Sequence, residues 1–312
     1  MNRTRQLTLS WLKSSRLTGD ARILEALLRR GFLAFRDDEG IWLGSGSHPL
    51  DIQVLAGIEG LGVTQQSREM GHVKVSAKRS VQAIADAILS LPEHHIDCRG
   101  MGFTSLGIPN LRPGWKQYRR MVWGAKLPVC ALDAVGQACG YGALDLGVAL
   151  LIKALPLVRV ATAYSCDGHG VAKLHVGFHF PWDASWCREI LDRILVGPRI
   201  ARWEFRGYDL FVHPSGGYGD SEVTALLNEV QRFARSLLNL HLIEAVAKAR
   251  ADTLAELGEL EPTMVRFEAC ASKNLQAVLG SLSPVVVSDL GCLFPNAGRL
   301  GSTPVSDGMK TD

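Results

Sequence analysis

The sequence predicts an α/β or α+β fold: a mixed or antiparallel sheet with flanking helices and a long C-terminal helix. Three observations support this prediction. Residues 157–165 and 171–180 show the alternation typical of two strands, joined by the bend SCDGHG. A wide apolar stripe at helical spacing covers 220–247. Shorter segments with helical spacing recur along the chain, at 20–31, 80–91, 142–155 and 184–195.

The N-terminal elements follow from local signals. The helix at 20–31 ends at Gly31, a residue that often follows a helix because it tolerates the left-handed conformation. The segment 32–45 has the pattern of two short strands with a turn at Glu39-Gly40. Ser80 has a side chain suited to capping the helix over 80–91. Further along, 201–213 is typical of another strand or hairpin.

Composition shifts divide the chain into regions. We expect an N-terminal α/β region at 1–99, a Gly/Pro-rich loop at 100–114 and a main α+β domain at 115–295. The tail 296–312 has too few apolar residues to bury and is predicted to be disordered. The stripe at 220–247 fits either a core helix or a helix that joins copies of the chain in a homo-oligomer or larger complex.

The bulk composition is that of a soluble globular protein. Apolar residues make up 47% of the 312 residues and charged residues 21%. The most apolar run, 142–163, is interrupted by Asp145, Lys153, Pro156 and Arg159, so we expect no membrane span. The basic start lacks the apolar stretch of a secretory signal, and the seven cysteines show no framework spacing. A cytoplasmic location with reduced thiols is therefore expected.

The bend between the two central strands gathers reactive side chains. Cys166, Asp167 and His169 occur within four residues, between Gly168 and Gly170. Glycines permit positive φ values at such bends and let backbone N–H groups point outward. We therefore expect the catalytic or metal-binding centre at this turn.

The neighbouring strand adds more candidates. Alternation places Lys173 and His175 on one face of the second strand, and pairing would bring Arg159 of the first strand to the same face. Tyr164 of the first strand is expected on the opposite face, with the apolar residues of the core. We expect His175 to be catalytic and Arg159 and Lys173 to line a pocket. An antiparallel hairpin with one solvated face produces the same alternation, so a purely structural hairpin stays open.

Two chemistries fit the turn. Cys166-x2-His169 is half of a typical zinc site, and His95-x2-Cys98 upstream would supply two further ligands. Alternatively, Cys166 would act as a nucleophile with its thiolate stabilised by His169 and backbone N–H groups. A site that pairs His175 with His179 is excluded, because four residues along a strand span about 13 Å.

A basic and aromatic segment follows Cys98. Residues 98–130 contain no Asp or Glu. We expect Arg112, Lys116, Arg119 and Arg120 to neutralise phosphates, and Trp115 and Tyr118 to stack on unpaired bases. The alternative is a solvated helix face with its aromatic rings in the core.

Two short resemblances concern the same turn. Asp167 to Gly170, DGHG, resembles the metal-binding aspartate motif of the 2C-type protein phosphatases. That family continues with a helix and needs further aspartates, whereas a strand is expected here, so the resemblance does not extend to function. The Ser165-Cys166-x-Gly168 turn is similar to the Ser-Cys-x-Gly hairpin of wybutosine-type tRNA-modifying methyltransferases, with His169 in place of a basic residue. This second resemblance implies an RNA substrate.

The sequence therefore predicts a nucleic-acid-directed protein, an enzyme with a metal-assisted or thiol centre at Cys166-Asp167-Gly168-His169. Its partner would be RNA or DNA. Two alternatives remain open: a non-catalytic nucleic-acid-binding or accessory subunit, and a small-molecule enzyme with no nucleic-acid role.

Overall fold

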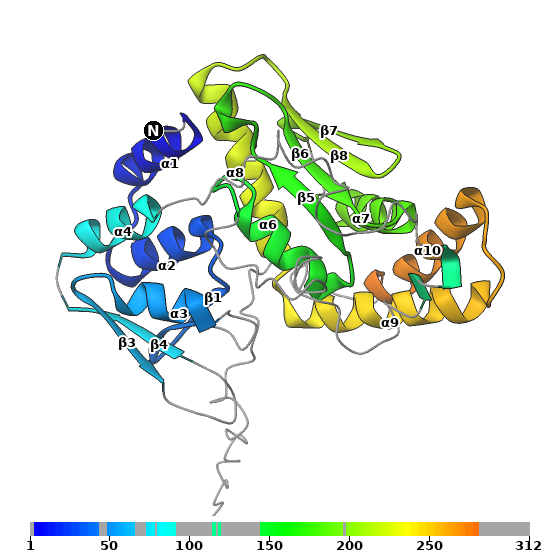
Figure 1. The fold of residues 1–312 in the computed structure, drawn as a ribbon, viewed down its shortest axis with the longest axis horizontal. Helices are drawn as coiled ribbons and strands as arrows, with labels where there is room; N and C mark the ends of the chain where they lie inside the picture. Colours follow the sequence, from blue (N-terminus) through cyan, green and yellow to red (C-terminus); the bar gives the residue numbers. More distant parts are fainter. Residues whose placement is uncertain are drawn as a thin grey trace, which may run out of the picture.

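A computed structural model describes residues 3–43, 49–65, 73–78, 80–91, 114–116, 118–119, 144–195 and 198–280. It has two antiparallel four-stranded sheets with helices packed around them, which confirms an α+β fold (Figure 1). Over the residues it describes, no helix combines the length and the apolar character needed to cross a bilayer.

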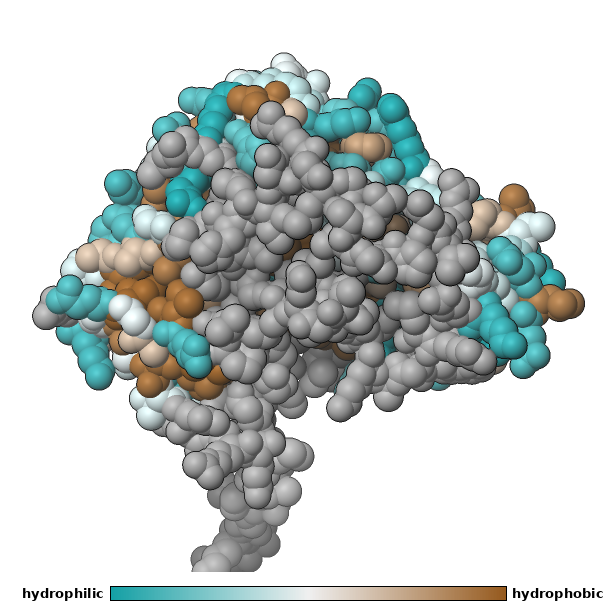
Figure 2. Space-filling view, in the orientation of Figure 1, coloured by the Kyte–Doolittle hydropathy of each residue, from teal (hydrophilic) through white to brown (hydrophobic). Residues whose placement is uncertain are grey.

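The first sheet belongs to the N-terminal half. Its strands are β1 (Ala34–Asp37), β2 (Gly40–Leu43), β3 (Leu61–Gln65) and β4 (Val73–Ala77), in the order β1-β2-β4-β3. The described residues of this half also form the helices α1 (Arg3–Ser14), α2 (Gly19–Arg30), α3 (Pro49–Ala56) and α4 (Val81–Ser90). In Figure 2 the hydrophobic residues of this half gather over α3, β3 and β4.

Local signals set the ends of these helices. Gly31 follows α2 with φ 90°, and its N–H donates to the carbonyl of Leu28 at 2.9 Å. A Cβ at this position would lie 2.6 Å from Cβ of Ala149. Glycine is therefore required both by the left-handed backbone and by close packing against the C-terminal half. The hydroxyl of Ser80 accepts a hydrogen bond from the N–H of Ala83, which confirms the predicted cap of α4.

The second sheet belongs to the C-terminal half. Its strands are β5 (Thr162–Cys166), β6 (Leu174–Phe178), β7 (Ala201–Arg206) and β8 (Asp209–Pro214), in the order β5-β6-β8-β7. The helices α7 (Pro181–Ile194) and α8 (Asp220–Ser236) pack against it. The side chains beneath them are fully buried: Leu174, Val176, Leu210 and Val212. A short helix, α6 (Ala149–Ala154), packs on α8 and leads through the 3-10 turn Leu155–Val158 to the sheet.

The predicted long helix at 220–247 is wrong in its length. The chain forms α8 and then α9 (Leu240–Leu257), separated at residues 237–239. Asn239 caps α9, because its side chain accepts a hydrogen bond from the N–H of Leu242 at 3.2 Å. Apolar residues continue across the break, so periodicity alone does not show it. The stripe on α8 is buried within this chain, which accounts for it without a second copy. A further helix, α10 (Met264–Leu279), packs on α9 and α7.

The register of the central hairpin also differs from the prediction. Strand β5 begins only at Thr162, and an irregularity between Thr162 and Tyr164 changes the face on which side chains lie. Tyr164 therefore pairs with Gly177 on the outer face, not with the core residues. Arg159 lies outside the strand, after the 3-10 turn, with φ 62°. The prediction that Arg159 shares a strand face with His175 is wrong.

Candidate metal centre

The turn between β5 and β6 has an unusual backbone. Gly168, His169 and Gly170 have φ values of 68°, 53° and 74°, all in the left-handed region. Glycines adopt this region readily, but a histidine does so at a cost of about 1 kcal/mol. The side chain of Asp167 compensates by accepting a hydrogen bond from the N–H of His169 at 2.8 Å. The turn therefore presents the imidazole of His169 in one defined orientation.

Asp167 is an internal anchor of this turn. Its side chain is fully buried, and its second oxygen, Oδ2, accepts a hydrogen bond from the N–H of Gly147 at 3.2 Å. Gly147 has to be a glycine, because a Cβ there would lie 2.9 Å from Cβ of Asp167. Asp167 thus connects the turn to the segment that leads into α6 through this hydrogen bond and this close contact.

The same segment contributes Asp145, which the sequence prediction missed. Its Oδ2 accepts a hydrogen bond from the N–H of Asp167 at 3.2 Å, so its carboxylate is held against the turn. A signal was present in the sequence. Asp145 is a carboxylate within the most apolar run of the chain, where a charge is costly unless it is compensated.

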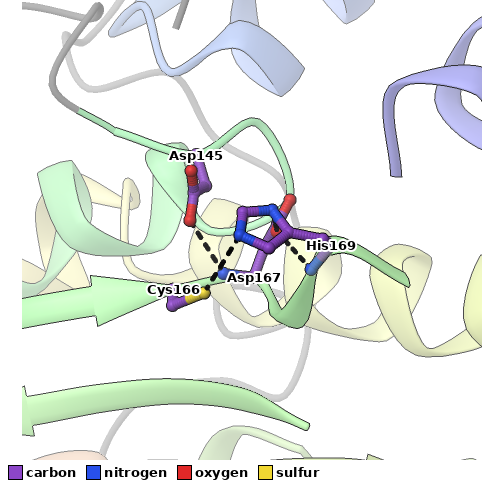
Figure 3. Close-up of side chains that lie close together, drawn as sticks. All are labelled: Asp145, Cys166, Asp167 and His169. Atoms are coloured by element: carbon purple, nitrogen blue, oxygen red, sulfur yellow. Dashed lines mark hydrogen bonds and ion pairs between the residues drawn. The ribbon is translucent and has the colours of Figure 1, made fainter. Parts of the chain in front are cut away.

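Four side chains meet at this place. The ligand atoms of Asp145, Cys166, Asp167 and His169 all lie within 4.8 Å of one another. Figure 3 shows Asp145 coming from the segment before α6 and Cys166 from the end of β5, with the ring of His169 beside both. Their donor atoms are oxygen, sulfur and nitrogen, a set typical of a transition-metal site.

The spacing of sulfur and nitrogen suits a common metal ion. Cys166 Sγ lies 3.8 Å from His169 Nε2. In a tetrahedral zinc site, bonds of about 2.3 Å to sulfur and about 2.0 Å to nitrogen put these two atoms about 3.5 Å apart. The pair therefore needs a movement of only a few tenths of an ångström to share one ion.

Asp167 lies behind the imidazole of His169. His169 Nδ1 is 3.3 Å from Asp167 Oδ1, so Nδ1 faces the carboxylate and Nε2 faces Cys166. Histidines that bind metals usually contact a carboxylate or carbonyl through the second ring nitrogen in this way. We therefore assign Asp145, Cys166 and His169 as candidate ligands and Asp167 as the residue that orients His169. The His169 side chain is 46% exposed, so the cluster lies at the surface.

The surroundings of Cys166 keep its thiol protonated. Burial, together with the carboxylates of Asp145 and Asp167, raises the pKa of Cys166 to about 11. The N–H of Gly168, 3.4 Å from the sulfur, lowers this pKa by less than burial raises it. At neutral pH a free thiolate is rare at such a site, which disfavours the interpretation of Cys166 as a nucleophile. A bound cation would reverse this balance by stabilising the thiolate.

His175 lies next to this cluster but belongs to another network. It is the register partner of Cys166, and its Nε2 lies 3.0 Å from Asp209 Oδ1. The hydroxyl of Tyr164 donates to the same oxygen at 2.5 Å. Burial and this hydrogen bond to Asp209 raise the pKa of Tyr164. The sequence prediction missed Tyr164 and Asp209, because it put Tyr164 on the other face and did not consider Asp209.

Lys173 lies further along the same face of the sheet. Its Nζ is 3.6 Å from the ring centroid of Phe211, and the ring of His175 stacks on Phe211 with centroids 4.5 Å apart. The sequence prediction put Lys173 and His175 on one face, and both side chains contact the ring of Phe211. The expectation that Lys173 lines a pocket stays a prediction.

The prediction that Trp115 and Tyr118 stack on unpaired bases is wrong, because both rings are buried. Trp115 is 2% exposed and Tyr118 is fully buried. Trp115 Nε1 donates to the carbonyl of Gly258 at 3.0 Å, and the Tyr118 hydroxyl accepts a hydrogen bond from Arg250. Both rings pack in an aromatic cluster whose other members are Phe180, Trp182 and Phe267. They stabilise the core and are not available to bases.

The remaining predicted residues have mixed outcomes. Lys116 is exposed and Arg119 is partly buried. Arg112, Arg120, His95 and Cys98 lie outside the described residues, so a zinc site that uses His95 and Cys98 stays a prediction. Asp145 puts a third candidate ligand beside Cys166 and His169 without them.

Comparisons of the chain with protein-family models, curated proteins and solved structures find no match. The two local resemblances noted at the turn are limited to the hairpin itself. The strand β6 follows DGHG in the structure, where the 2C-type phosphatases continue with a helix.

Proposed function

We propose that the protein is a metal-dependent enzyme whose centre is formed by Asp145, Cys166 and His169. The observation that carries this proposal is the convergence of their ligand atoms, with Cys166 Sγ and His169 Nε2 3.8 Å apart. A thiolate and an imidazole favour zinc or a similar transition metal, because magnesium and calcium prefer oxygen ligands.

The number of protein ligands supports catalysis over a structural role. Structural zinc sites are closed by four protein ligands, whereas catalytic sites have three and leave one position for water or substrate. Here Asp167 is committed to the N–H groups of Gly147 and His169, which leaves three candidate ligands among the residues that the structure describes. The His169 side chain is 46% exposed, so water or a substrate would have access to a bound ion. A metal at such a position would polarise a carbonyl or phosphoryl oxygen, or activate a water molecule.

We further propose a nucleic acid, RNA or DNA, as the substrate. This part rests on charge: residues 98–130 have six basic and no acidic side chains, and Lys116 is exposed. The burial of Trp115 and Tyr118 removes the aromatic support for it. A small-molecule substrate and a non-catalytic accessory role are the alternatives to be separated by experiment.

Metal content tests the proposal directly. The purified protein should bind about one equivalent of zinc, and cobalt should give the absorption of a thiolate-bound ion. Cys166→Ser and His169→Gln should each weaken binding more than tenfold. Cys270→Ser and His213→Gln are matched controls, because Cys270 lies in α10 and His213 in β8, outside the cluster. The proposal is wrong if the parent protein binds no metal, or if the two cluster variants bind it as tightly as the controls.

A further inference from the structure

The first helix reaches directly onto the metal-binding turn through Arg3. Its Nη1 donates to the carbonyl of Gly170 at 2.8 Å. Its Nη2 donates to the carbonyl of Tyr218 at 2.7 Å and to Asp220 Oδ1 at 2.5 Å, and Nε donates to the same carboxylate oxygen. One guanidinium thus bridges the turn and the start of α8. Its planar array of donors suits several acceptors at fixed angles.

At this contact the backbone of α1 lies close to the backbone of the turn. A Cβ on Gly170 would lie 3.3 Å from the side chain of Arg3 and 3.3 Å from the backbone nitrogen of Thr4. Gly170 also has φ 74°, so any other residue would be strained there. The first turn of α1 is therefore seated against the backbone that follows His169.

Arg3 and Asp167 hold the turn from opposite ends. Asp167 fixes the N–H of His169, and Arg3 fixes the carbonyl of Gly170, the residue immediately after it. His169 itself has a left-handed backbone that an L-residue rarely adopts without support. Loss of the hydrogen bond from Arg3 to the carbonyl of Gly170 would let residues 168–170 relax and move the imidazole away from Cys166.

We infer that Arg3 is a positioning residue of the metal centre, so that docking of α1 and metal binding are coupled. This inference rests on the proposed function, because it needs the cluster to bind a metal. Coupling between two events is reciprocal: if docked α1 favours the metal, then the metal favours docked α1. The first helix also contacts the rest of the N-terminal half: it lies beside α4 (Figure 1), and Arg5 donates to the carbonyl of Leu91 at the end of α4 at 3.0 Å. Metal occupancy would thus be transmitted to the packing of the two halves.

Arg5 provides a matched control. It lies on the same helix and also donates to a backbone carbonyl, but its partner is on α4 and not on the turn. We expect Arg3→Ala to weaken cobalt binding about tenfold, the lower end of the loss seen when groups that orient metal ligands are removed. Its cobalt spectrum should also change, because the imidazole would be less well oriented. Arg3→Lys should recover part of the affinity, and Arg5→Ala should lose clearly less affinity for cobalt than Arg3→Ala, because it removes no contact to the turn.

Hydrogen exchange on the unaltered full-length protein tests the reciprocal effect and needs no variant. Zinc should slow exchange of the amides of α1, and Arg3→Ala should abolish this slowing. Unchanged exchange of α1 in the zinc-bound parent protein would overturn the inference. So would equal losses of affinity in Arg3→Ala and Arg5→Ala. If the parent protein binds no metal, the proposed function fails first, which is a distinct result.

Discussion

The buried carboxylate of Asp167 holds both the backbone and the ring of His169. Its Oδ1 accepts the N–H of His169 at 2.8 Å and lies 3.3 Å from Nδ1 of the same residue. One side chain thus stabilises the left-handed turn and directs Nε2 of the imidazole toward Cys166. The fold and the candidate site therefore depend on the same group.

Asp167→Asn should reduce both stability and metal affinity. The amide keeps one oxygen acceptor, but its NH₂ group would face a backbone N–H, so either Gly147 or His169 loses its partner. A buried N–H without an acceptor costs about 1–3 kcal/mol, which urea unfolding of the metal-free protein would measure. Zinc affinity should fall about 10–100-fold.

The exposed Asp192, which pairs with Arg199 on the surface, gives a control for this change. Asp192→Asn should leave zinc affinity unchanged and lower stability by less than about 1 kcal/mol. If Asp167→Asn matched Asp192→Asn in both measurements, the turn would not depend on the buried carboxylate.

The thiol of Cys166 should react slowly in the metal-free protein. Because its pKa is raised to about 11, the reactive thiolate is scarce at neutral pH and increases as pH rises toward that value. Alkylation by iodoacetamide, followed at the Cys166 peptide by mass spectrometry, should therefore accelerate steadily from pH 7 to pH 10. A plateau of the rate below pH 9 would contradict the raised pKa. Added zinc should slow the reaction at every pH, because the sulfur would be coordinated.

Gly168→Ala should be more destabilising than the same change at Gly207. Both glycines have positive φ, 68° and 60°. A Cβ on Gly168 would lie 2.7 Å from the carbonyl oxygen of Lys173, whereas nothing lies within 4 Å of a Cβ on Gly207. Gly207→Ala should thus lower the free energy of unfolding by about 1 kcal/mol, which is the strain of the left-handed backbone alone. Gly168→Ala should lower it by at least about 2 kcal/mol, because a steric clash is added. Equal unfolding free energies for the two variants would mean that the turn adjusts without cost.

Local chemistry explains which parts of the fold were predictable. The helix ending at Gly31, the cap at Ser80 and the strands around SCDGHG each depend on residues within a few positions of one another. These signals act over short distances, so a single sequence displays them. The same holds for Cys166 and His169, which the turn itself brings together.

Tertiary contacts explain what was missed. Asp145 joins the cluster from 22 positions before Asp167, through a hydrogen bond that no periodicity indicates. The break before Asn239 and the shift of Tyr164 to the outer face each depend on packing against other elements. Trp115 was assigned to the surface because it lies among basic residues, yet its ring is buried against Trp182. The role of each of these residues depends on which parts of the fold surround it, and the composition of the neighbouring sequence does not show this.

The nucleic-acid proposal predicts different effects for substitutions at Lys116 and at Tyr118 in the basic segment. Lys116 is exposed, so Lys116→Ala should weaken binding to RNA or DNA similarly for all sequences. It should also make the plot of the logarithm of the binding constant against the logarithm of the salt concentration less steep, by about one unit of slope. Tyr118 is buried and accepts a hydrogen bond from Arg250, so Tyr118→Phe should lower stability by about 1–3 kcal/mol and leave binding unchanged. Fluorescence anisotropy of labelled oligonucleotides at several salt concentrations measures the first effect, and urea unfolding the second. If neither RNA nor DNA bound the parent protein, the substrate would have to be sought among small molecules, because Asp145, Cys166 and His169 lie outside this segment.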